Sequence, residues 1–350
     1  CSSDLLLDRS RKNNPSKDEW SGTRLFEIGE ENSSEAKTAL RLYSSALGLN
    51  KGEENELDMG SKKTLSSLLE FSRKYYPAKH YGLIIWGHGT GYRMYSEKEE
   101  FCNSRAVAID ETSGTFMETC VLKEAVLNGM GSDKLELIGF DTCFSAELEE
   151  VFELRNCAQT FVGIEGSQNV DGWNYSKWMN EKLSSCENGK EVARLIREQD
   201  QNVSIVELEK AEEIFNSFDS FSNKAASLIK TNVQASELNG LLLRKCNIFT
   251  VLGNEMNPVY IDVMSLCECL SNELGNLDEE KSALQIALEN SIESIEADDG
   301  ALFPLGVYFC SLDSKSNVID EISPFYTNGS KVKNQCEFVK FSKGYVHTIS

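Results

Sequence analysis

Proline, histidine and long apolar runs are scarce in this sequence. Of its 350 residues, only 5 are Pro and 3 are His. No stretch of about 20 consecutive apolar residues occurs, so the sequence predicts no membrane-spanning segment. No basic start precedes an apolar run, so no signal peptide is visible. Three His also leave few ligands for zinc, and the pair formed by Cys267 and Cys269 has no second pair beside it, which argues against a zinc site.

Positive charge is also in short supply. The chain has 35 Lys and Arg against 56 Asp and Glu, which gives a formal net charge of −21 and a pI near 4.7. Such a chain repels phosphate backbones, so nucleic acid is not expected as a partner. The charge would attract cationic ligands or basic peptide segments, although it can equally serve only to keep the protein in solution.

The composition is typical of a folded globular protein. Apolar residues make up 40% of the chain and charged residues 26%. The 11 Cys are odd in number and irregularly spaced, so most are expected to be buried thiols rather than a disulfide framework. The sequence opens on Cys1, as a mature bacterial lipoprotein opens on its lipidated Cys; alternatively, the sequence simply starts there.

Strand-like and helical patterns alternate in the first half of the chain. Residues 81–86 are a continuous apolar run, and 135–140 and 161–164 are further strand-like segments. Helical patterns cover 115–128 and 144–154. A fully apolar strand is what a parallel sheet covered on both faces requires. The sequence therefore predicts an α/β fold with a mainly parallel central sheet.

The rest of the chain is organised around helices. A helical pattern covers residues 33–47, and residues 173–243 are expected to be mostly helical. A soft boundary near residue 225 divides the chain into residues 1–225, which carry the sheet, and a smaller α+β region at 226–350.

Two of the expected strands end in residues that can do chemistry. One ends in Gly87-His88-Gly89 and the other in Asp141-Thr142-Cys143. Functional groups in parallel sheets gather beyond the carboxyl ends of the strands. A Cys nucleophile needs a base that produces its thiolate, and His is the usual base. The sequence thus favours a Cys143 nucleophile with His88 as general base.

The neighbours of this pair fit the same chemistry. Glycine lets backbone approach a ligand closely, so the amides of Gly89 and Cys143 are candidates for an oxyanion hole. A helix that begins at Phe144 would place Cys143 at the positive end of the helix dipole.

Each of these residues also has a simpler explanation. A Cys at a strand end is more often a small buried residue, and a His between glycines can be an ordinary loop residue. The spacing of Gly87, Gly89 and Gly91 partly matches the dinucleotide-binding G-x-G-x-x-G pattern, but its third glycine would fall at Tyr92. A nucleotide- or flavin-dependent oxidoreductase is therefore a weaker alternative.

Several stretches resemble the clostripain family of cysteine peptidases, and together they span most of the chain. The most specific are Leu83-Ile84-Ile85-Trp86-Gly87-His88-Gly89, Gly139-Phe140-Asp141-Thr142-Cys143, and Glu165 followed by Gly172-Trp173-Asn174-Tyr175. The C-terminal pieces, Tyr260-Ile261-Asp262 and Gly306-Val307-Tyr308-Phe309, are less specific. The resemblance implies a caspase-like αβα sandwich, a His88–Cys143 dyad, and peptide or protein substrates cleaved after Arg or Lys.

Cleavage after a basic residue needs acid in the pocket that binds the P1 side chain. Asp141 lies two residues before the nucleophile, and Asp171 lies directly before Gly172. Both fit such a pocket by position. Alternatively, Asp141 orients its own loop and Asp171 is a turn residue. Glu165 and Trp173, which belong to the resembling motifs, are further candidates for substrate binding.

The resemblance also implies processing. Family members commonly cut themselves in a loop after the His strand, and here Arg105-Ala106 follows a polar stretch at 97–104. Self-cleavage is therefore expected between Arg105 and Ala106, with Lys98 as a weaker site. Family members usually open with a strand and helix that this sequence does not supply, so an upstream segment is expected.

Location and cofactors complete the expectation. Some family members use calcium, but no D-x-D-x-D-G loop is present, so no calcium site is assigned and no other cofactor is expected. We expect secretion or a place in the cell envelope, with a lipid on Cys1 as an option. A catalytically inactive binding protein with the same fold, in which Cys143 is inert, is the other alternative.

Overall fold

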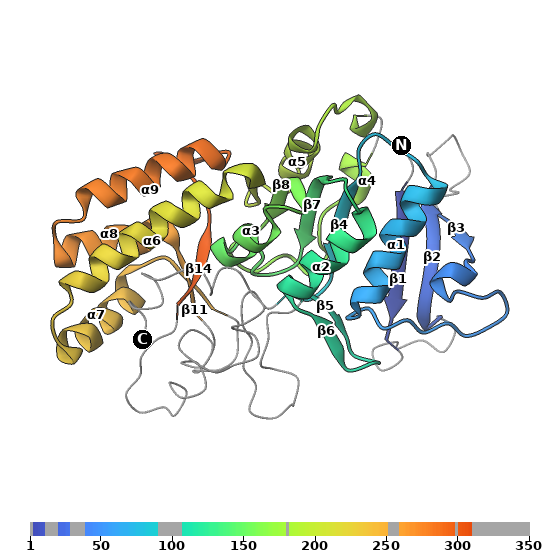
Figure 1. Ribbon diagram of the computed structural model, residues 1–350, viewed down its shortest axis with the longest axis horizontal. Helices are drawn as coiled ribbons and strands as arrows, with labels where there is room; N and C mark the ends of the chain where they lie inside the picture. The colour runs from blue at the N-terminus through green and yellow to red at the C-terminus, as the bar shows by residue number, and fades with distance from the viewer. Residues whose placement is uncertain are drawn as a thin grey trace.

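The computed structural model describes residues 3–10, 20–28, 39–89, 107–179, 182–250, 259–297 and 300–309. At the centre of this part of the chain is a four-stranded sheet in the order β4-β7-β8-β9 (Figure 1). Its strands are β4 (Gly82–Trp86), β7 (Leu135–Asp141), β8 (Ala158–Gly163) and β9 (Ser204–Glu207). The first three are parallel, and β9 pairs antiparallel to β8. The mainly parallel α/β sheet predicted from the sequence is confirmed.

Helices cover both faces of this sheet, so the fold has three layers (Figure 1). They are α2 (Thr119–Met130) and α3 (Leu148–Leu154) on one face, and α4 (Tyr175–Trp178) and α5 (Gly189–Arg197) on the other. Phe140 of β7 belongs to the buried cluster on the α2 and α3 side, whereas Leu137 belongs to the cluster on the α5 side. Residues of opposite parity on one strand thus fill two different cores.

The C-terminal helices share the core of the α2 and α3 face. These helices are α6 (Ala211–Leu228), α7 (Asn232–Lys245), α8 (Val263–Leu274) and α9 (Asp278–Ser291). Phe152 of α3 stacks on Phe215 of α6, with 4.1 Å between ring centroids. Residue 225, near which the sequence predicts a boundary, lies inside α6, and Ala225 is fully buried. The division into residues 1–225 and 226–350 stays a prediction.

Shorter strands form small antiparallel sheets. One contains β10 (Ile248–Thr250), β11 (Val259–Asp262) and β14 (Gly306–Phe309); the others pair β12 (Ile295–Ala297) with β13 (Gly300–Leu302), and β5 (Val107–Asp110) with β6 (Thr115–Met117). Within the first of these, Tyr260 of β11 stacks on Phe144, with 5.3 Å between ring centroids. Because Phe144 follows Cys143, the C-terminal region supports the turn that carries the predicted nucleophile.

An antiparallel sheet near the N-terminus packs against α1 (Lys62–Tyr75). Its strands, in order, are β1 (Ser3–Arg9), β2 (Gly22–Ile28) and β3 (Ala39–Leu42). The helix predicted over residues 33–47 is wrong for β3, which is extended and pairs Leu42 with Leu25. Pairing with β2 and burial of Leu25 outweigh the local helical pattern.

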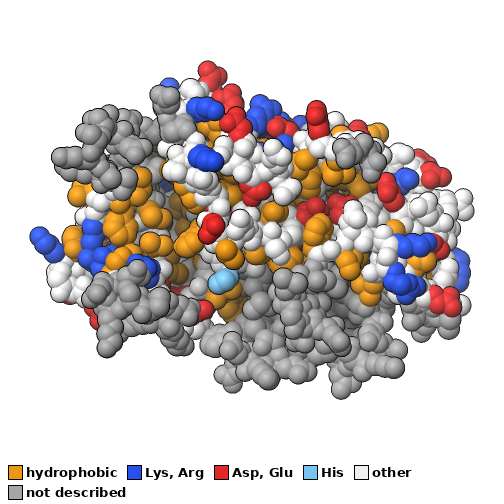
Figure 2. Space-filling view, turned by 180° about the vertical axis from the view of Figure 1, so that it is seen from behind, with side chains coloured by type: hydrophobic (Ala, Val, Ile, Leu, Met, Phe, Trp, Pro, Cys, Tyr) orange, Lys and Arg blue, Asp and Glu red, His pale blue; other side chains and the backbone are white. Residues whose placement is uncertain are grey.

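The length and hydropathy of the helices bear on membrane spanning, and the surface shows how the charged side chains are distributed. None of the helices among the described residues is long and apolar enough to cross a membrane. On the face drawn in Figure 2, Lys and Arg side chains lie in several separate groups, interspersed with acidic and apolar side chains.

Candidate active site

The ends of β4 and β7 bring two loops side by side. Trp86 pairs with Asp141 in the parallel register. His88 and Cys143 therefore each lie two residues beyond a matched position, at the same edge of the sheet. The amide of Gly87 donates to the carbonyl oxygen of Asp141 at 3.4 Å, which ties the two loops together. The His88 side chain is exposed, and Cys143 is partly buried.

Gly89 lies directly against the loop that follows β7. A Cβ built on Gly89 would come within 2.6 Å of Thr142 Oγ1 and 2.7 Å of Thr142 Cβ. Only a residue without a side chain fits there, so the close approach of the two loops depends on this glycine.

The chain turns sharply after Cys143. Phe144 has a φ of 50°, which is uncommon for a residue other than glycine, and its amide donates to the carbonyl oxygen of Gly166 at 2.8 Å. The amides of Ser145 and Ala146 both donate to Ile164. These bonds to the segment after β8 keep residues 144–147 out of a helix.

The helix predicted from Phe144 is therefore wrong at its start. α3 begins at Leu148, and its N-cap residue is Glu147. Cys143 lies outside the first turn of α3, where the helix dipole acts. The donors near the end of β7 come from the loop after β8 and not from a helix terminus: the amides of Gln168 and Trp173 and the hydroxyl of Tyr175.

Asp141 organises the loop after β8. Its Oδ2 accepts the amide of Trp173 at 2.8 Å and the hydroxyl of Tyr175 at 2.9 Å, and its Oδ1 accepts Nε2 of Gln168 at 3.0 Å. The side chain is only 2% exposed. Burial raises the pKa of Asp141, whereas these three donors oppose the rise because they stabilise the carboxylate. The carboxylate thus holds residues 168–175 beside the strand ends.

Gln168 lies between the carboxylate and the thiol. Its amide donates to Cys143 Sγ at 3.2 Å, and the Sγ lies 3.8 Å from the Gln168 carbonyl oxygen. Sequence reasoning missed Gln168 and Tyr175 as site residues, because each reaches Asp141 or Cys143 across more than 20 positions of the chain. The only sequence signal for Tyr175 was its place in the Gly172-Trp173-Asn174-Tyr175 motif.

Trp86 is another residue that the sequence reasoning left out. It lies directly before Gly87-His88, and its side chain is 55% exposed. Its Nε1 lies 2.8 Å from the position that a Cβ on Gly172 would take, and Gly172 has a φ of 63°. The indole therefore lies over the turn that Asp141 organises, on the open side of the site. Its place at the end of an apolar strand was the signal that could have identified it.

Asp171 and Trp173 occupy opposite environments. Asp171 is exposed, and its amide donates to the side chain of Asn169. Trp173 is 3% exposed, and its indole packs against Gly139, where a Cβ would come within 3.2 Å of the ring. Trp173 therefore anchors the loop in the core, and its predicted contact with substrate stays a prediction, as does the pocket role of Asp171.

Glu165 faces the C-terminal region. Its carboxyl group is hydrogen-bonded to that of Asp262, the N-cap of α8. Burial raises the pKa of both groups, and the neighbouring Asp262 charge raises that of Glu165 further. Two carboxyl groups hydrogen-bond only when one of them carries a proton. The predicted role of Glu165 in substrate binding stays a prediction.

Some predicted residues lie outside the described part of the chain. These are Cys1, Lys98, Arg105 and Ala106. The predicted self-cleavage position and the option of a lipid on Cys1 therefore have no structural description.

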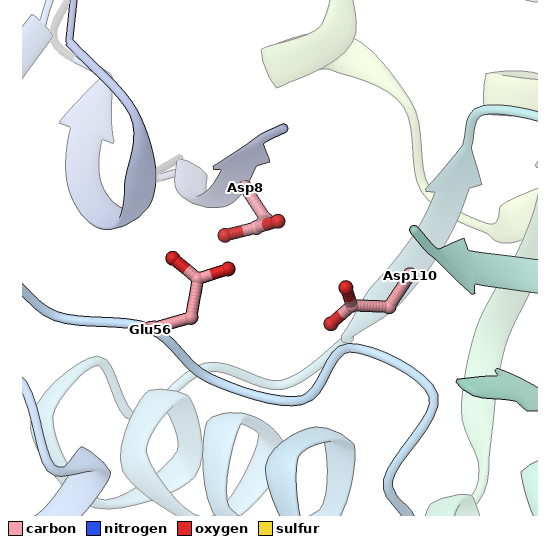
Figure 3. A group of neighbouring side chains, drawn as sticks. All are labelled: Asp8, Glu56 and Asp110. Carbon is pink, nitrogen blue, oxygen red and sulfur yellow. The ribbon is translucent and has the colours of Figure 1, made fainter. Parts of the chain in front are cut away.

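A group of acidic side chains lies away from the strand ends, between the N-terminal sheet and β5 (Figure 3). Carboxylate oxygens of Asp8, Glu56 and Asp110 lie within 4.8 Å of one another, a donor set of the type that calcium prefers. Their oxygens already have partners in the chain: Asp110 accepts the amide of Met59, and Asp8 accepts the hydroxyl of Thr23. The cluster is therefore satisfied in part without an ion.

A protein-family comparison and a structural comparison both find relatives. The model of the clostripain family matches residues 34–295. A secreted C11 cysteine protease from Bacteroides thetaiotaomicron, in complex with an irreversible peptide inhibitor, is 14% identical with a TM-score of 0.58; the match covers 91% of this chain and 86% of that chain. An inactive zymogen C11 protease from Parabacteroides distasonis is 17% identical with a TM-score of 0.57, over 90% and 84% of the two chains.

These likenesses concern the fold. The arrangement of the chain matches that of the two proteases, so the caspase-like αβα sandwich predicted from the sequence is confirmed. No curated protein matches the sequence.

Proposed function

Because the chain belongs to the clostripain family of cysteine peptidases, we propose that it is an endopeptidase that cleaves after Arg or Lys through a His88–Cys143 dyad. The observation that carries this proposal is the register of β4 and β7, in which Trp86 pairs with Asp141. In that register, His88 and Cys143 each lie two residues beyond the end of their strand, on adjacent parallel strands. The family membership contradicts the alternative of a nucleotide- or flavin-dependent oxidoreductase.

The proposed reaction uses both strand-end loops. His88 takes the proton of the Cys143 thiol, and the thiolate attacks the scissile carbonyl carbon. The amides of Gly89 and Cys143 stabilise the negative oxygen of the tetrahedral intermediate. The C–N bond breaks, the amine leaves with the proton from His88, and a thioester forms. Water activated by His88 then releases the acid product and restores the thiol.

The P1 side chain would meet the two acids beside the nucleophile. Asp171 is exposed on the loop after β8, where an incoming cation reaches it first. Asp141 lies deeper, and Trp173 packs in the core behind it. Glu165 and Trp173 remain further candidates for substrate binding. A cationic P1 group would be drawn to both carboxylates, in keeping with the net charge of −21.

The test is hydrolysis of reporter peptides with Arg, Lys or Asp at P1. We expect wild type to cleave the Arg and Lys peptides, and Cys143→Ala and His88→Ala each to lose about a thousandfold or more in kcat. Cys186→Ala and His80→Ala are matched controls, since Cys186 is a free thiol elsewhere and His80 instead pairs with Glu136. Wild type without hydrolysis of any peptide would indicate an inactive binding protein.

Self-cleavage between Arg105 and Ala106 belongs to the same proposal. Mass spectrometry of purified wild type, Cys143→Ala and Arg105→Ala tests it. Only wild type should be cut after Arg105, and equal clipping of wild type and Cys143→Ala would assign the cut to another protease. One structural relative is described as a secreted protease, which supports secretion of this chain as the proposed location.

A further inference from the structure

One residue contacts both the predicted nucleophile and the deeper acid, the first through its backbone and the second through its side chain. The backbone N–H of Gln168 donates to Cys143 Sγ at 3.2 Å, while its side-chain Nε2 donates to Asp141 Oδ1 at 3.0 Å. Gln168 is partly buried. It therefore links the thiol and the carboxylate directly.

The two oxygens of Asp141 have partners of different kinds. Oδ2 accepts the backbone N–H of Trp173 and the hydroxyl of Tyr175. Trp173 is 3% exposed, so this pair of donors is fixed by the core. Among the described residues, Oδ1 accepts only from Gln168. That partner is a side-chain amide whose Oε1 also accepts the backbone N–H of Asn169 at 2.9 Å. Neither bond joins two backbone groups, so the amide can turn away from Asp141 without loss of backbone pairing in the loop.

We propose that Gln168 is a specificity-determining residue that competes with the substrate: its amide holds the position on Asp141 Oδ1 that the cation of a P1 Arg or Lys takes. This inference rests on the proposed function, because it assigns Asp141 to the P1 pocket. Binding of a basic P1 side chain exchanges the Gln168 amide for a cationic donor.

The chemistry of the exchange favours cations. A charged donor forms a hydrogen bond to a carboxylate that is about twice as strong as that of a neutral amide. A guanidinium or ammonium group therefore displaces the Gln168 amide with a net gain. An apolar P1 side chain offers no donor, so Gln168 stays on Asp141 and the depth of the pocket is closed to it. The Gln168 amide thus occupies Asp141 Oδ1 when no cation is bound. Because that hydrogen bond must break first, it lowers the affinity of the site for every cation.

Two substitutions separate this role from a structural one. Gln168→Met keeps the unbranched shape but removes the amide donors, and Gln168→Ala removes the side chain. Gln285→Met is the matched control, because Gln285 is exposed on α9 and its Nε2 donates to Glu289 instead. Binding is measured by calorimetry with agmatine, which carries a guanidinium group and no scissile bond.

In Gln168→Met the agmatine Kd should fall by about two- to tenfold. This factor corresponds to the free energy of one ordinary hydrogen bond, which agmatine no longer has to break when it binds. KM for Arg peptides should fall in parallel, and the ratio of kcat/KM for Arg peptides to kcat/KM for peptides with norleucine at P1 should rise. A merely structural role would instead raise KM and lower kcat for both peptides. An agmatine Kd that is unchanged or raised in Gln168→Met overturns the proposal, as does agmatine binding to neither protein. Failure of the proposed function is a separate result, read from wild-type hydrolysis of basic peptides.

Discussion

The Cα of Gly89 lies so close to Cys143 that a Cβ added there would collide with the Cys143 carbonyl oxygen. The obstructing atoms are this backbone oxygen and the Oγ1 and Cβ of Thr142. Rotation of the Thr142 side chain can move Oγ1 but leaves the backbone oxygen and the Cβ in place. The contact joins the loop that carries the proposed base to the loop that carries the proposed nucleophile.

Replacing Gly89 by Ala should therefore damage catalysis more than folding. We expect Gly89→Ala to lower kcat by about 100-fold, the usual effect of displacing one oxyanion-hole donor. Gly82→Ala is the control, since Gly82 lies on the same strand and loop unit but its nearest neighbour is 3.8 Å from the added Cβ. Kinetics with an Arg reporter peptide measure the effect. Full kcat in Gly89→Ala would contradict this role for the contact.

The hydroxyl group of Tyr175 should be important for both catalysis and stability, because it donates to Asp141. Burial and the nearby Asp141 charge raise the pKa of Tyr175, so its hydroxyl stays protonated and remains a donor to Asp141 Oδ2. A hydrogen bond to a charged group contributes about 1.5–3 kcal/mol. Tyr175→Phe should lower kcat/KM for basic peptides by about tenfold and lower the free energy of unfolding by about 1.5–3 kcal/mol.

The matched control for this change is Tyr75→Phe, because Tyr75 is 54% exposed on α1 and its ring contacts Phe71 of the same helix. Urea unfolding and peptide kinetics are measured on both variants. Equal behaviour of the two would mean that the Tyr175 hydroxyl does not hold the loop.

The strand ends could be predicted from the sequence because their signals are local. Continuous apolar residues before His88 and a strand-like segment before Cys143 identify two strands, and parallel strands gather their carboxyl ends at one edge. β9 was missed, because its four residues, Ser204–Glu207, carry too little periodicity to distinguish them from the helices around them. The contacts of Asp141 could not be predicted from the sequence for a different reason. Its donors come from a loop whose path is set by packing of Trp173 against Gly139.

The start of α3 illustrates the same limit. Residues after Cys143 have acidic and apolar side chains in a helical pattern, yet the helix begins only at Leu148. The amides of Phe144, Ser145 and Ala146 find acceptors at Gly166 and Ile164 instead. Because those acceptors lie about twenty residues away, local propensity could not reveal them.

Ser145 should be important for the stability of this turn. Its Oγ accepts the amide of Ile164 at 3.0 Å and donates to the carbonyl oxygen of Thr142 at 3.2 Å, and the side chain is 2% exposed. Ser145→Ala leaves a buried N–H without an acceptor, so the free energy of unfolding should fall by about 1–3 kcal/mol. Urea denaturation measures it, with the exposed Ser176→Ala as control. A change as small as that of the control would show that another acceptor replaces Ser145.

Glu147 should make stability depend on pH. Its side chain is 0% exposed, neither carboxyl oxygen has a hydrogen-bond partner among the residues that the structure describes, and the carboxyl group lies against Gly306. Burial raises the pKa of Glu147 well above its usual range, and the nearby charges of Glu149, Glu165 and Glu150 raise it further. The folded protein therefore keeps this proton at pH values where the unfolded chain, with a Glu pKa of about 4.3, has released it.

The direction in which stability changes with pH follows from that difference in bound protons. Since the folded state binds more protons than the unfolded state above about pH 4.3, the stability contribution of Glu147 is full below that pH and falls as pH rises toward the folded pKa. Glu147→Gln keeps the shape without the titration, so its stability relative to wild type should rise by about 1.4 kcal/mol per pH unit across this window. Urea denaturation between pH 5 and 7 measures the slope, with Glu296→Gln on the exposed strand β12 as control. Equal slopes, which leave a constant offset between wild type and Glu147→Gln, would show that Glu147 does not keep its proton in the folded protein across this pH range.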